Sequence, residues 1–198
     1  MSDDQPFRLI LIILFAALVP VGMYHRIKSQ STGEKLDRRQ EGAFMLATLR
    51  PIGFALWLGA LVWLVDPAWM FWSSISLPDS PRWIGFALMI AGGALILWTF
   101  RSLGKNLTDT VVTRREHTLV TRGPYRWVRH PLYAAAAILV VGMSLITANW
   151  FFLVTGVIVL ALLVSRTRTE EENLVRRFGD DYRAYMARTG RFFPTRVP

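Results

Sequence analysis

The sequence predicts an all-α integral membrane protein, and three observations point to this class. Hydrophobic residues make up 53% of the 198 residues and the mean hydropathy is +0.33, which is high for a soluble globule. The apolar residues gather in runs of the length that a membrane-spanning helix needs. The 23 Lys and Arg residues stand almost entirely between these runs. We therefore predict five transmembrane helices followed by a C-terminal cytoplasmic amphipathic helix.

The first two predicted helices come from the N-terminal third of the chain. Residues 7–24 are apolar apart from Arg8, and no small-residue cleavage site follows them, so we expect an uncleaved spanning helix instead of a signal peptide. Pro20 lies inside this run, and membrane helices tolerate such a proline. The second run covers residues 51–65, and its helix is expected to begin near Phe44.

A tryptophan-rich segment separates the second run from the third. Trp69 and Trp72 stand where aromatic side chains commonly lie at the level of the lipid headgroups. The third run covers residues 83–100 and has Gly92 and Gly93 at its centre. Small residues at this position favour close approach of a neighbouring helix.

The last apolar run, residues 132–165, predicts a helical hairpin. Its length of about 33 residues exceeds the roughly 20 residues of one membrane crossing and falls short of two crossings with a loop. The only polar break is at residues 147–149. We therefore predict two short helices, 132–146 and 149–165, joined by a tight turn.

The distribution of basic residues predicts the orientation of the chain in the membrane. Residues 25–50, 101–131 and 166–198 hold six, seven and eight Lys or Arg residues, which is 21 of the 23. Only Arg8 and Arg82 fall on the other side of a five-span topology. Because basic loops stay in the cytoplasm, the N-terminus is expected outside and the C-terminus in the cytoplasm.

The tail is expected to form a separate amphipathic helix over residues 169–188, because apolar residues recur there at helical spacing. Glu170, Glu171 and Glu172 would then lie in its first turn, where the helix dipole favours negative charge. Gly179 is expected to break the helix.

Residues 117–133, HTLVTRGPYRWVRHPLY, hold the most unusual combination of side chains in the chain. They include three aromatic residues, two of the three histidines and three arginines. Pro124 and Pro131 each remove a backbone donor, and Gly123 tolerates dihedrals that other residues avoid, so this backbone is expected to have a specific irregular shape. We interpret the stretch as the wall of a site at the membrane surface.

Together with the later pattern EENLVRRFGDDYRAY and RFFP near the end, this stretch resembles the isoprenylcysteine carboxyl methyltransferase family, which is related to the phospholipid N-methyltransferases. The resemblance covers roughly residues 84–194, the expected catalytic core. Residues 1–83 form an N-terminal two-helix region without a recognisable motif, and we expect residues 1–198 to form a single membrane-embedded domain. The resemblance implies methyl transfer from S-adenosylmethionine to a lipophilic acceptor at the cytoplasmic membrane face, with an isoprenylcysteine-like carboxylate as the expected acceptor.

The resemblance also implies roles for individual residues. Arg166 would meet the substrate, and the catalytic set would be Arg166, Arg129 and Glu170. A substrate carboxylate needs a permanent cation, which Arg166 or Arg129 would supply, whereas an ammonium acceptor would need Glu170 or Glu171 as a base. The residues that would bind the cofactor are His117, Thr118, Leu119, Val120, Tyr125, His130, Pro131, Leu132, Tyr133 and Glu170.

Not every residue near the motif is expected to take part in the chemistry. Arg122 and Arg126 are interpreted as positive-inside anchors, and Glu172 as a solvated residue. The family pattern usually continues R-H-P-x-Y-x-G, whereas this chain has Ala135 in place of the glycine. The added methyl group would narrow the pocket slightly or change nothing.

Other functions stay open at this level. A phospholipid amine or a small thiol would replace the carboxylate within methyl transfer. A membrane reductase that uses NADPH, like the sterol reductases, is the rival from another class; the chain shows no extra spans and no G-x-G-x-x-G turn for it. A transporter would need functional polar residues inside the spans, and the apolar runs contain charges only near their ends.

Composition limits the partners further. The chain has no cysteine and therefore no thiolate metal site, and three histidines without acidic partners at ligand spacing predict no metal. The net charge of +9 is attributed to topology and anionic headgroups, so no nucleic acid is expected. The expected partners are membrane lipids and a lipophilic small-molecule or lipid-modified substrate.

Overall fold

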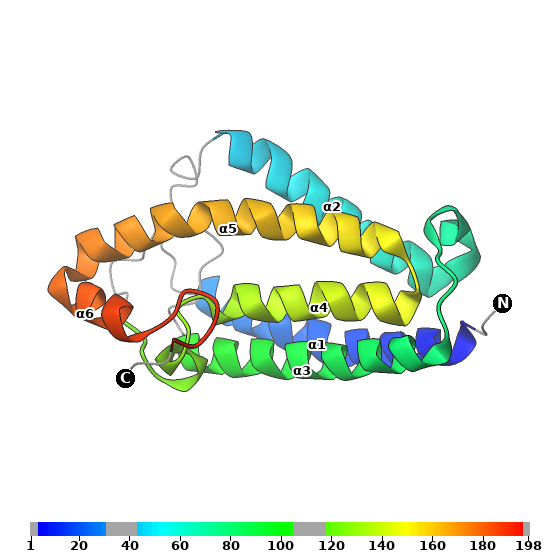
Figure 1. Cartoon of the computed structure of the whole chain (residues 1–198), viewed down its shortest axis with the longest axis horizontal. Coiled ribbons are helices and arrows are strands. Elements are labelled where there is room, and N and C mark those ends of the chain that lie inside the picture. The colour runs from blue at the N-terminus through cyan, green and yellow to red at the C-terminus, as the bar shows by residue number, and fades with distance from the viewer. Residues whose placement is uncertain (1–3, 31–42, 105–117, 196–198) are drawn as a thin grey trace.

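The structure, a computed structural model, describes residues 4–30, 43–104 and 118–195. Figure 1 shows long helices running side by side, with α6 and the C-terminus at one end of the molecule and the N-terminus at the other. Two 3₁₀ helices, η2 (Pro67–Ser73) and η4 (Gly123–Arg126), lie at opposite ends. The α-helices are α1 (Gln5–Gln30), α2 (Ala43–Val65), α3 (Asp79–Leu103), α4 (Pro131–Thr147), α5 (Trp150–Phe178) and α6 (Asp180–Arg188).

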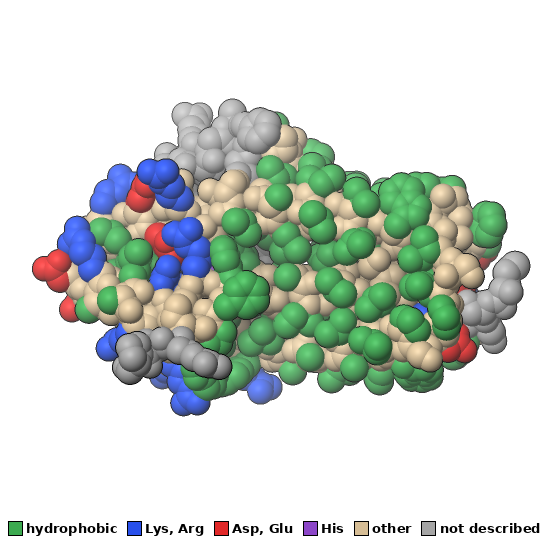
Figure 2. All heavy atoms as spheres, viewed as in Figure 1, with side chains coloured by type: hydrophobic (Ala, Val, Ile, Leu, Met, Phe, Trp, Pro, Cys, Tyr) green, Lys and Arg blue, Asp and Glu red, His purple; other side chains and the backbone are tan. Residues whose placement is uncertain are grey.

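All five predicted apolar helices are present, which confirms the all-α membrane class. Among the described residues, α1, α2, α3 and α5 are long and apolar enough to cross a membrane. The fifth, α4, has 17 residues and a length of about 25 Å, slightly less than the roughly 30 Å of a hydrocarbon core. Hydrophobic side chains cover the long flank of the molecule, and charged side chains gather at the end that carries α6 (Figure 2). A full crossing by α4, and the orientation of the termini, stay predictions.

Glycines bring α3 close to its neighbours. A Cβ atom added to Gly92 would lie 2.8 Å from the Leu139 side chain of α4, and one added to Gly93 would lie 2.8 Å from Leu18 of α1. The expectation that these glycines allow close helix approach is therefore confirmed. The contact is tightest at Gly85, where a Cβ would lie 2.6 Å from the backbone nitrogen of Ile146. Because backbone atoms cannot move aside as a side chain can, a larger residue here would force α3 and α4 apart.

We therefore expect Gly85→Ala to lower the free energy of unfolding by about 1–3 kcal/mol through overpacking. Gly53 of α2 provides the matched control, because a Cβ added there meets nothing within 4 Å. Gly53→Ala should leave the stability unchanged or raise it by about 0.5–1 kcal/mol through helix propensity. Denaturant titration of the two variants in detergent measures the difference, and equal effects would contradict the tight contact.

The turn between α4 and α5 forms where the polar break predicts it. Ala148 adopts the left-handed conformation with φ of 47°, and its backbone N–H donates to the carbonyls of Leu145 and Ser144. The side chain of Asn149 then accepts a hydrogen bond from Phe151 N at 3.0 Å, which caps the start of α5. The predicted turn and the first helix are confirmed, but the second helix is not short, because α5 runs to Phe178 instead of ending at residue 165.

The predicted start of a separate tail helix near residue 169 is wrong. α5 continues without a break from Trp150 to Phe178, so Glu170, Glu171 and Glu172 lie in its middle and not in a first turn. Only Gly179, with φ of 56°, ends the helix, and α6 begins at Asp180. The charges of the glutamates are paired with arginines instead: Glu171 with Arg129 from the segment before α4, and Glu170 and Glu172 with the arginine four residues earlier on α5.

At the end of the molecule opposite α6, two arginines bind backbone carbonyls at helix ends. Arg8 donates from Nε to the carbonyl of Leu64 at 2.7 Å, and from Nη2 to that of Val65. Arg82 is fully buried and donates from Nε to the carbonyl of Ile146 at 3.1 Å. Both contacts place positive charge at the C-terminal end of a helix, where the helix dipole favours it.

Candidate functional site

The segment before α4 is shaped by its glycine and prolines, as expected. Gly123 has φ of 63°, and a Cβ atom there would lie 2.1 Å from Ser102 Oγ, so this position requires glycine. Pro124 follows in the first turn of η4, which packs against the end of α3. Pro131 then opens α4, with His130 immediately before it. The result is a fixed turn that brings His130 and Tyr133 to the α6 end of the molecule.

Residues 189–192, which follow α6 and which we call the C-terminal strap, pair their backbone with this turn. Arg129 N donates to the carbonyl of Gly190 at 2.8 Å, and His130 N donates to that of Arg191 at 3.0 Å. In return, Gly190 N donates to the carbonyl of Trp127 at 3.3 Å. Segments about 60 residues apart in the chain therefore meet in a short parallel pairing.

Glu171 joins the strap to the turn through its side chain. Arg129 Nε donates to Glu171 Oε1 at 2.8 Å, and Arg191 Nη2 donates to Glu171 Oε2. His130 Nε2 lies 3.3 Å from Glu171 Oε1. With only 5% of its side chain exposed, Glu171 is a buried carboxylate whose charge is matched by the two arginines.

Glu170 has a different set of neighbours and is less buried. Its Oε1 accepts a hydrogen bond of 2.7 Å from the hydroxyl of Tyr133 and lies 3.5 Å from Arg166 Nη2. Its Oε2 lies 3.5 Å from His130 Nδ1. The side chain of Glu170 is 18% exposed, and the pairing with Arg166 has the i,i+4 spacing expected from the sequence. Of the two glutamates, Glu170 is the one that is open to a ligand.

Aromatic rings line this ionic cluster. The rings of His130 and Tyr133 are nearly parallel, with centroids 5.3 Å apart and planes at 5°. Phe192 of the strap lies 5.7 Å from His130 and 6.5 Å from Tyr133 between ring centroids. The cluster therefore offers carboxylates and cations beside flat apolar surfaces, a combination that suits a ligand with a ring and charged groups.

Tyrosines of α6 attach this helix to the body of the protein. Tyr182 and Tyr185 are buried, and the hydroxyl of Tyr185 donates to the carbonyl of Tyr125 at 2.6 Å. Burial raises the pKa of Tyr185 to about 12, and it also raises the pKa values of Tyr125 and Tyr182. These hydroxyls stay protonated near neutral pH, and the burial of Tyr182 and Tyr185 shows that both pack α6 against the body of the protein.

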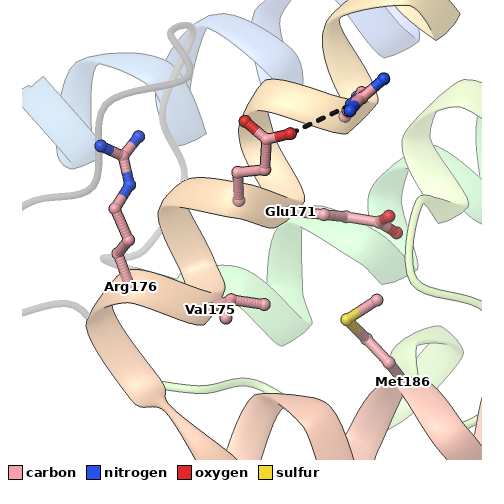
Figure 3. A pocket seen from close by; sticks show the side chains of 6 residues that line it. Glu171, Val175, Arg176 and Met186 are labelled. Atoms are coloured by element: carbon pink, nitrogen blue, oxygen red, sulfur yellow. Dashed lines mark hydrogen bonds and ion pairs between the residues drawn. The ribbon is translucent and has the colours of Figure 1, made fainter.

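A groove of about 550 Å³ opens beside the cluster, between α5 and α6. Figure 3 shows Val175 and Met186 facing each other across it, with Arg176 pointing outward and Glu171 at its inner side. Glu171 is one of the residues that line the groove, whereas Glu170 and Tyr133 do not line it. We therefore place the candidate site at Glu170, Tyr133 and His130, and not in this groove.

The structure brings together five of the residues predicted from the sequence, namely Arg129, His130, Tyr133, Arg166 and Glu170. Tyr125 contributes a backbone carbonyl to α6, Pro131 is buried and Leu132 is half-buried. Thr118, Leu119 and Val120 form the irregular segment that leads towards η4. His117 lies outside the described residues. The roles assigned to all these residues stay predictions.

Three residues of the cluster were missed or undervalued by the sequence reasoning. Glu171 was considered only as an alternative base, and Arg191 and Phe192 were assigned no role. The RFFP pattern that contains the latter two is the signal that pointed to this segment. Ala135, the departure from the family pattern, is fully buried in α4.

Comparison with known proteins finds relatives of this chain. The chain is 30% identical to the nickel-cobalt-cadmium resistance protein NccN of Alcaligenes xylosoxydans xylosoxydans over 113 residues, which cover 57% of this chain and 52% of that protein. It is 29% identical to the protein-S-isoprenylcysteine O-methyltransferase of Rattus norvegicus over 132 residues, covering 65% and 45%. The chain thus spans about half the length of these curated relatives.

The fold and the family follow from two further comparisons. A solved structure of the eukaryotic intramembrane Ras methyltransferase, isoprenylcysteine carboxyl methyltransferase, matches with a TM-score of 0.54 and 18% identity. The match covers 91% of this chain and 66% of that one, which shows a shared fold. The family profile described as phospholipid methyltransferase matches residues 81–181, just over half of the chain, and includes α3, α4 and α5. The chain belongs to the phospholipid methyltransferase family.

Proposed function

We propose that this protein transfers a methyl group from S-adenosylmethionine to a lipophilic acceptor at the cytoplasmic face of the membrane. The observation that carries the proposal is the position of Glu170. Its carboxylate is held by the Tyr133 hydroxyl at 2.7 Å, lies 3.5 Å from Arg166, and is flanked by aromatic rings. Membership of a methyltransferase family supports the same reading.

The residues of the cluster fit the chemical groups of S-adenosylmethionine. This cofactor supplies an electrophilic methyl group on a sulfonium cation, together with an adenine ring and an amino acid moiety. A carboxylate stabilises a cationic group, and Glu170 is better suited than Glu171 because it is more exposed and does not face two guanidinium donors. The faces of Tyr133 and Phe192 suit contact with a ring or a sulfonium. Residues 117–120, Tyr125, Pro131 and Leu132 would complete the pocket.

A carboxylate is the acceptor that we favour. Arg166 is a permanent cation with 9% of its side chain exposed, beside Glu170 on α5, and would hold the acceptor's negative charge near the methyl donor. A carboxylate nucleophile needs no general base, because it is already deprotonated at neutral pH and has no proton to lose when it attacks the methyl group. Arg129 and Arg166 would then align the reactants, and the aromatic rings would exclude water. The names of relatives such as the rat protein support this acceptor.

A phospholipid amine is the second candidate acceptor, and the family description favours it. An ammonium group must lose a proton before it can attack, and Glu170 is the most exposed carboxylate of the cluster that could accept it. Family membership also counts against the reductase alternative, since no step of methyl transfer uses a nicotinamide.

Titration of S-adenosylhomocysteine into the purified protein tests the cofactor. We expect saturable binding that Glu170→Gln weakens at least about tenfold, the effect of losing a charge-assisted contact. Glu172→Gln is the matched control, because Glu172 is exposed and pairs with Arg168 on the outer side of α5. A folded wild-type protein that does not bind S-adenosylhomocysteine would refute the proposal. Transfer of a radiolabelled methyl group then distinguishes the acceptors, because a methyl ester releases methanol in alkali and a methylated amine does not.

A further inference from the structure

The C-terminal strap (residues 189–192) contacts the candidate site through its backbone, through the Arg191 side chain and through the Phe192 ring. Its backbone makes three hydrogen bonds to the segment from Trp127 to His130. One of them satisfies the N–H of His130, which precedes the first turn of α4 and has no acceptor within that helix. The strap therefore helps to define where α4 begins.

Arg129 secures the start of the strap from the other side. Its Nη1 atom donates to the carbonyl of Met186 at 3.1 Å and to that of Thr189. Both carbonyls belong to the end of α6 and the residue after it, where backbone acceptors lack partners within the helix. The Thr189 hydroxyl also donates to the carbonyl of Tyr185. The junction of α6 and the strap is thus fixed to Arg129.

Arg191 closes the arrangement through Glu171. It donates to both oxygens of Glu171, from Nε at 3.3 Å and from Nη2 at a shorter distance. Oε1 of Glu171 is also the atom that faces Arg129 and His130. Arg191 therefore shares with Arg129 in fixing the orientation in which the Glu171 carboxylate faces both the strap and His130.

The orientation of the His130 ring follows from these contacts. Its Nε2 faces Glu171 and its Nδ1 faces Glu170, while Phe192 of the strap lies against the ring. If the strap moved away, the ring would lose the Phe192 contact, and Glu171 would lose one of its two arginines. The His130 imidazole therefore contacts Glu170, Tyr133 and the strap at the same time, so a movement of the strap would change the surroundings of the other two.

We propose that Arg191 is a positioning residue, which holds the strap against the turn and, through Glu171, fixes His130 for cofactor binding. The second half of this inference rests on the function proposed above. Arg191 does not need to touch the cofactor, and its side chain is 43% exposed, so its removal leaves the core of the fold in place. The candidate site thus includes the chain's C-terminal segment as a structural wall.

The absence of cysteine from the chain makes a clean test possible. Phe193 is 82% exposed and directly follows the strap, so a nitroxide label on Phe193→Cys reports the mobility of this segment in lipid nanodiscs. The label is studied in the full-length protein alone and with Arg191→Ala, Arg191→Lys or, as control, Arg188→Ala, which changes an exposed arginine at the end of α6. Binding of S-adenosylhomocysteine is measured on the same samples.

We expect Arg191→Ala to add a fast-motion component to the spectrum and to weaken S-adenosylhomocysteine binding about tenfold. Arg191→Lys should restore only part of both properties, because it keeps a cationic donor but cannot reproduce the two guanidinium contacts with Glu171, and Arg188→Ala should change neither. Unchanged label mobility in Arg191→Ala would overturn the role of Arg191 in holding the strap. Increased mobility with unchanged affinity would overturn the positioning role.

Failure of the proposed function would have a different signature. If the wild-type protein binds no S-adenosylhomocysteine, the link between the strap and that cofactor is overturned. The label mobility still decides, independently of any ligand, whether Arg191 holds the strap. The two parts of the inference are therefore refuted by different measurements.

Discussion

Replacing Arg129 by lysine should lower the proposed methyl transfer at least about a hundredfold, although the positive charge is kept. The same replacement should reduce the free energy of unfolding by about 2–4 kcal/mol, because buried acceptors lose their donors. Arg129 donates at once to Glu171 and to the carbonyls of Met186 and Thr189, with 10% of its side chain exposed. A lysine ammonium is a compact point charge and does not span three acceptors in a fixed plane.

Arg126 supplies the matched control for this prediction. It lies three residues earlier, is exposed, and places its guanidinium 3.8 Å from the centre of the Trp127 ring. Arg126→Lys keeps a cation beside the Trp127 ring and should leave both activity and stability unchanged. Labelled methyl transfer and denaturant titration measure the two quantities. Equal effects of the two replacements would mean that Arg129 acts only as a basic anchor.

Arg126 and Arg129 differ in contacts with distant parts of the chain, which the sequence does not reveal, whereas features that depend on neighbouring residues can be predicted from it. The helices are predictable because a membrane-spanning helix needs a continuous run of about 20 apolar residues. Such a run can be recognised in the sequence without knowing the rest of the structure. The pairing of Arg166 with Glu170 is predictable for the same reason, since residues four apart lie on one face of a helix. The different roles of Arg126 and Arg129 depend instead on Glu171 and on α6, which are more than 40 residues away.

The three consecutive glutamates of α5 have different environments that the sequence does not reveal. Successive helical residues point about 100° apart, so Glu170, Glu171 and Glu172 cannot all face the same partner. Their side chains are 18%, 5% and 57% exposed, and the arginines that pair with them differ: Arg166 for Glu170, Arg129 and Arg191 for Glu171, and Arg168 for Glu172. Sequence reasoning placed the glutamates in a first turn because the apolar run stops at residue 165, whereas α5 continues to Phe178. The partner of Glu171 on the C-terminal side, Arg191, is 20 residues away and follows a second helix.

Replacing Arg82 by alanine should destabilise the protein by about 3 kcal/mol without weakening ligand binding to the folded molecule. Sequence reasoning placed Arg82 near the end of the third apolar run, on the side opposite the basic loops, and gave it no structural role, whereas the structure buries it completely in the first turn of α3. Its guanidinium lies 3.9 Å from the centre of the Phe7 ring, donates to the carbonyl of Ile146, and pairs with Asp4 at 2.7 Å. One side chain therefore joins the start of α1, the start of α3 and the end of α4.

The expected loss comes mainly from the buried contacts of Arg82 and only slightly from its ion pair. Asp4 is 42% exposed, so water can solvate its carboxylate when the arginine is removed, whereas the carbonyl of Ile146 and the face of Phe7 lose a buried partner. Arg82→Met should recover the part of the loss that is due to packing, because it fills most of the volume without donating a hydrogen bond. Arg101→Ala, at an exposed position in the last turn of the same helix, should leave stability within about 0.5 kcal/mol of the wild type. Denaturant titration separates these outcomes: a loss for Arg82→Ala no larger than that for Arg101→Ala would show that α1, α3 and α4 are held together without the arginine.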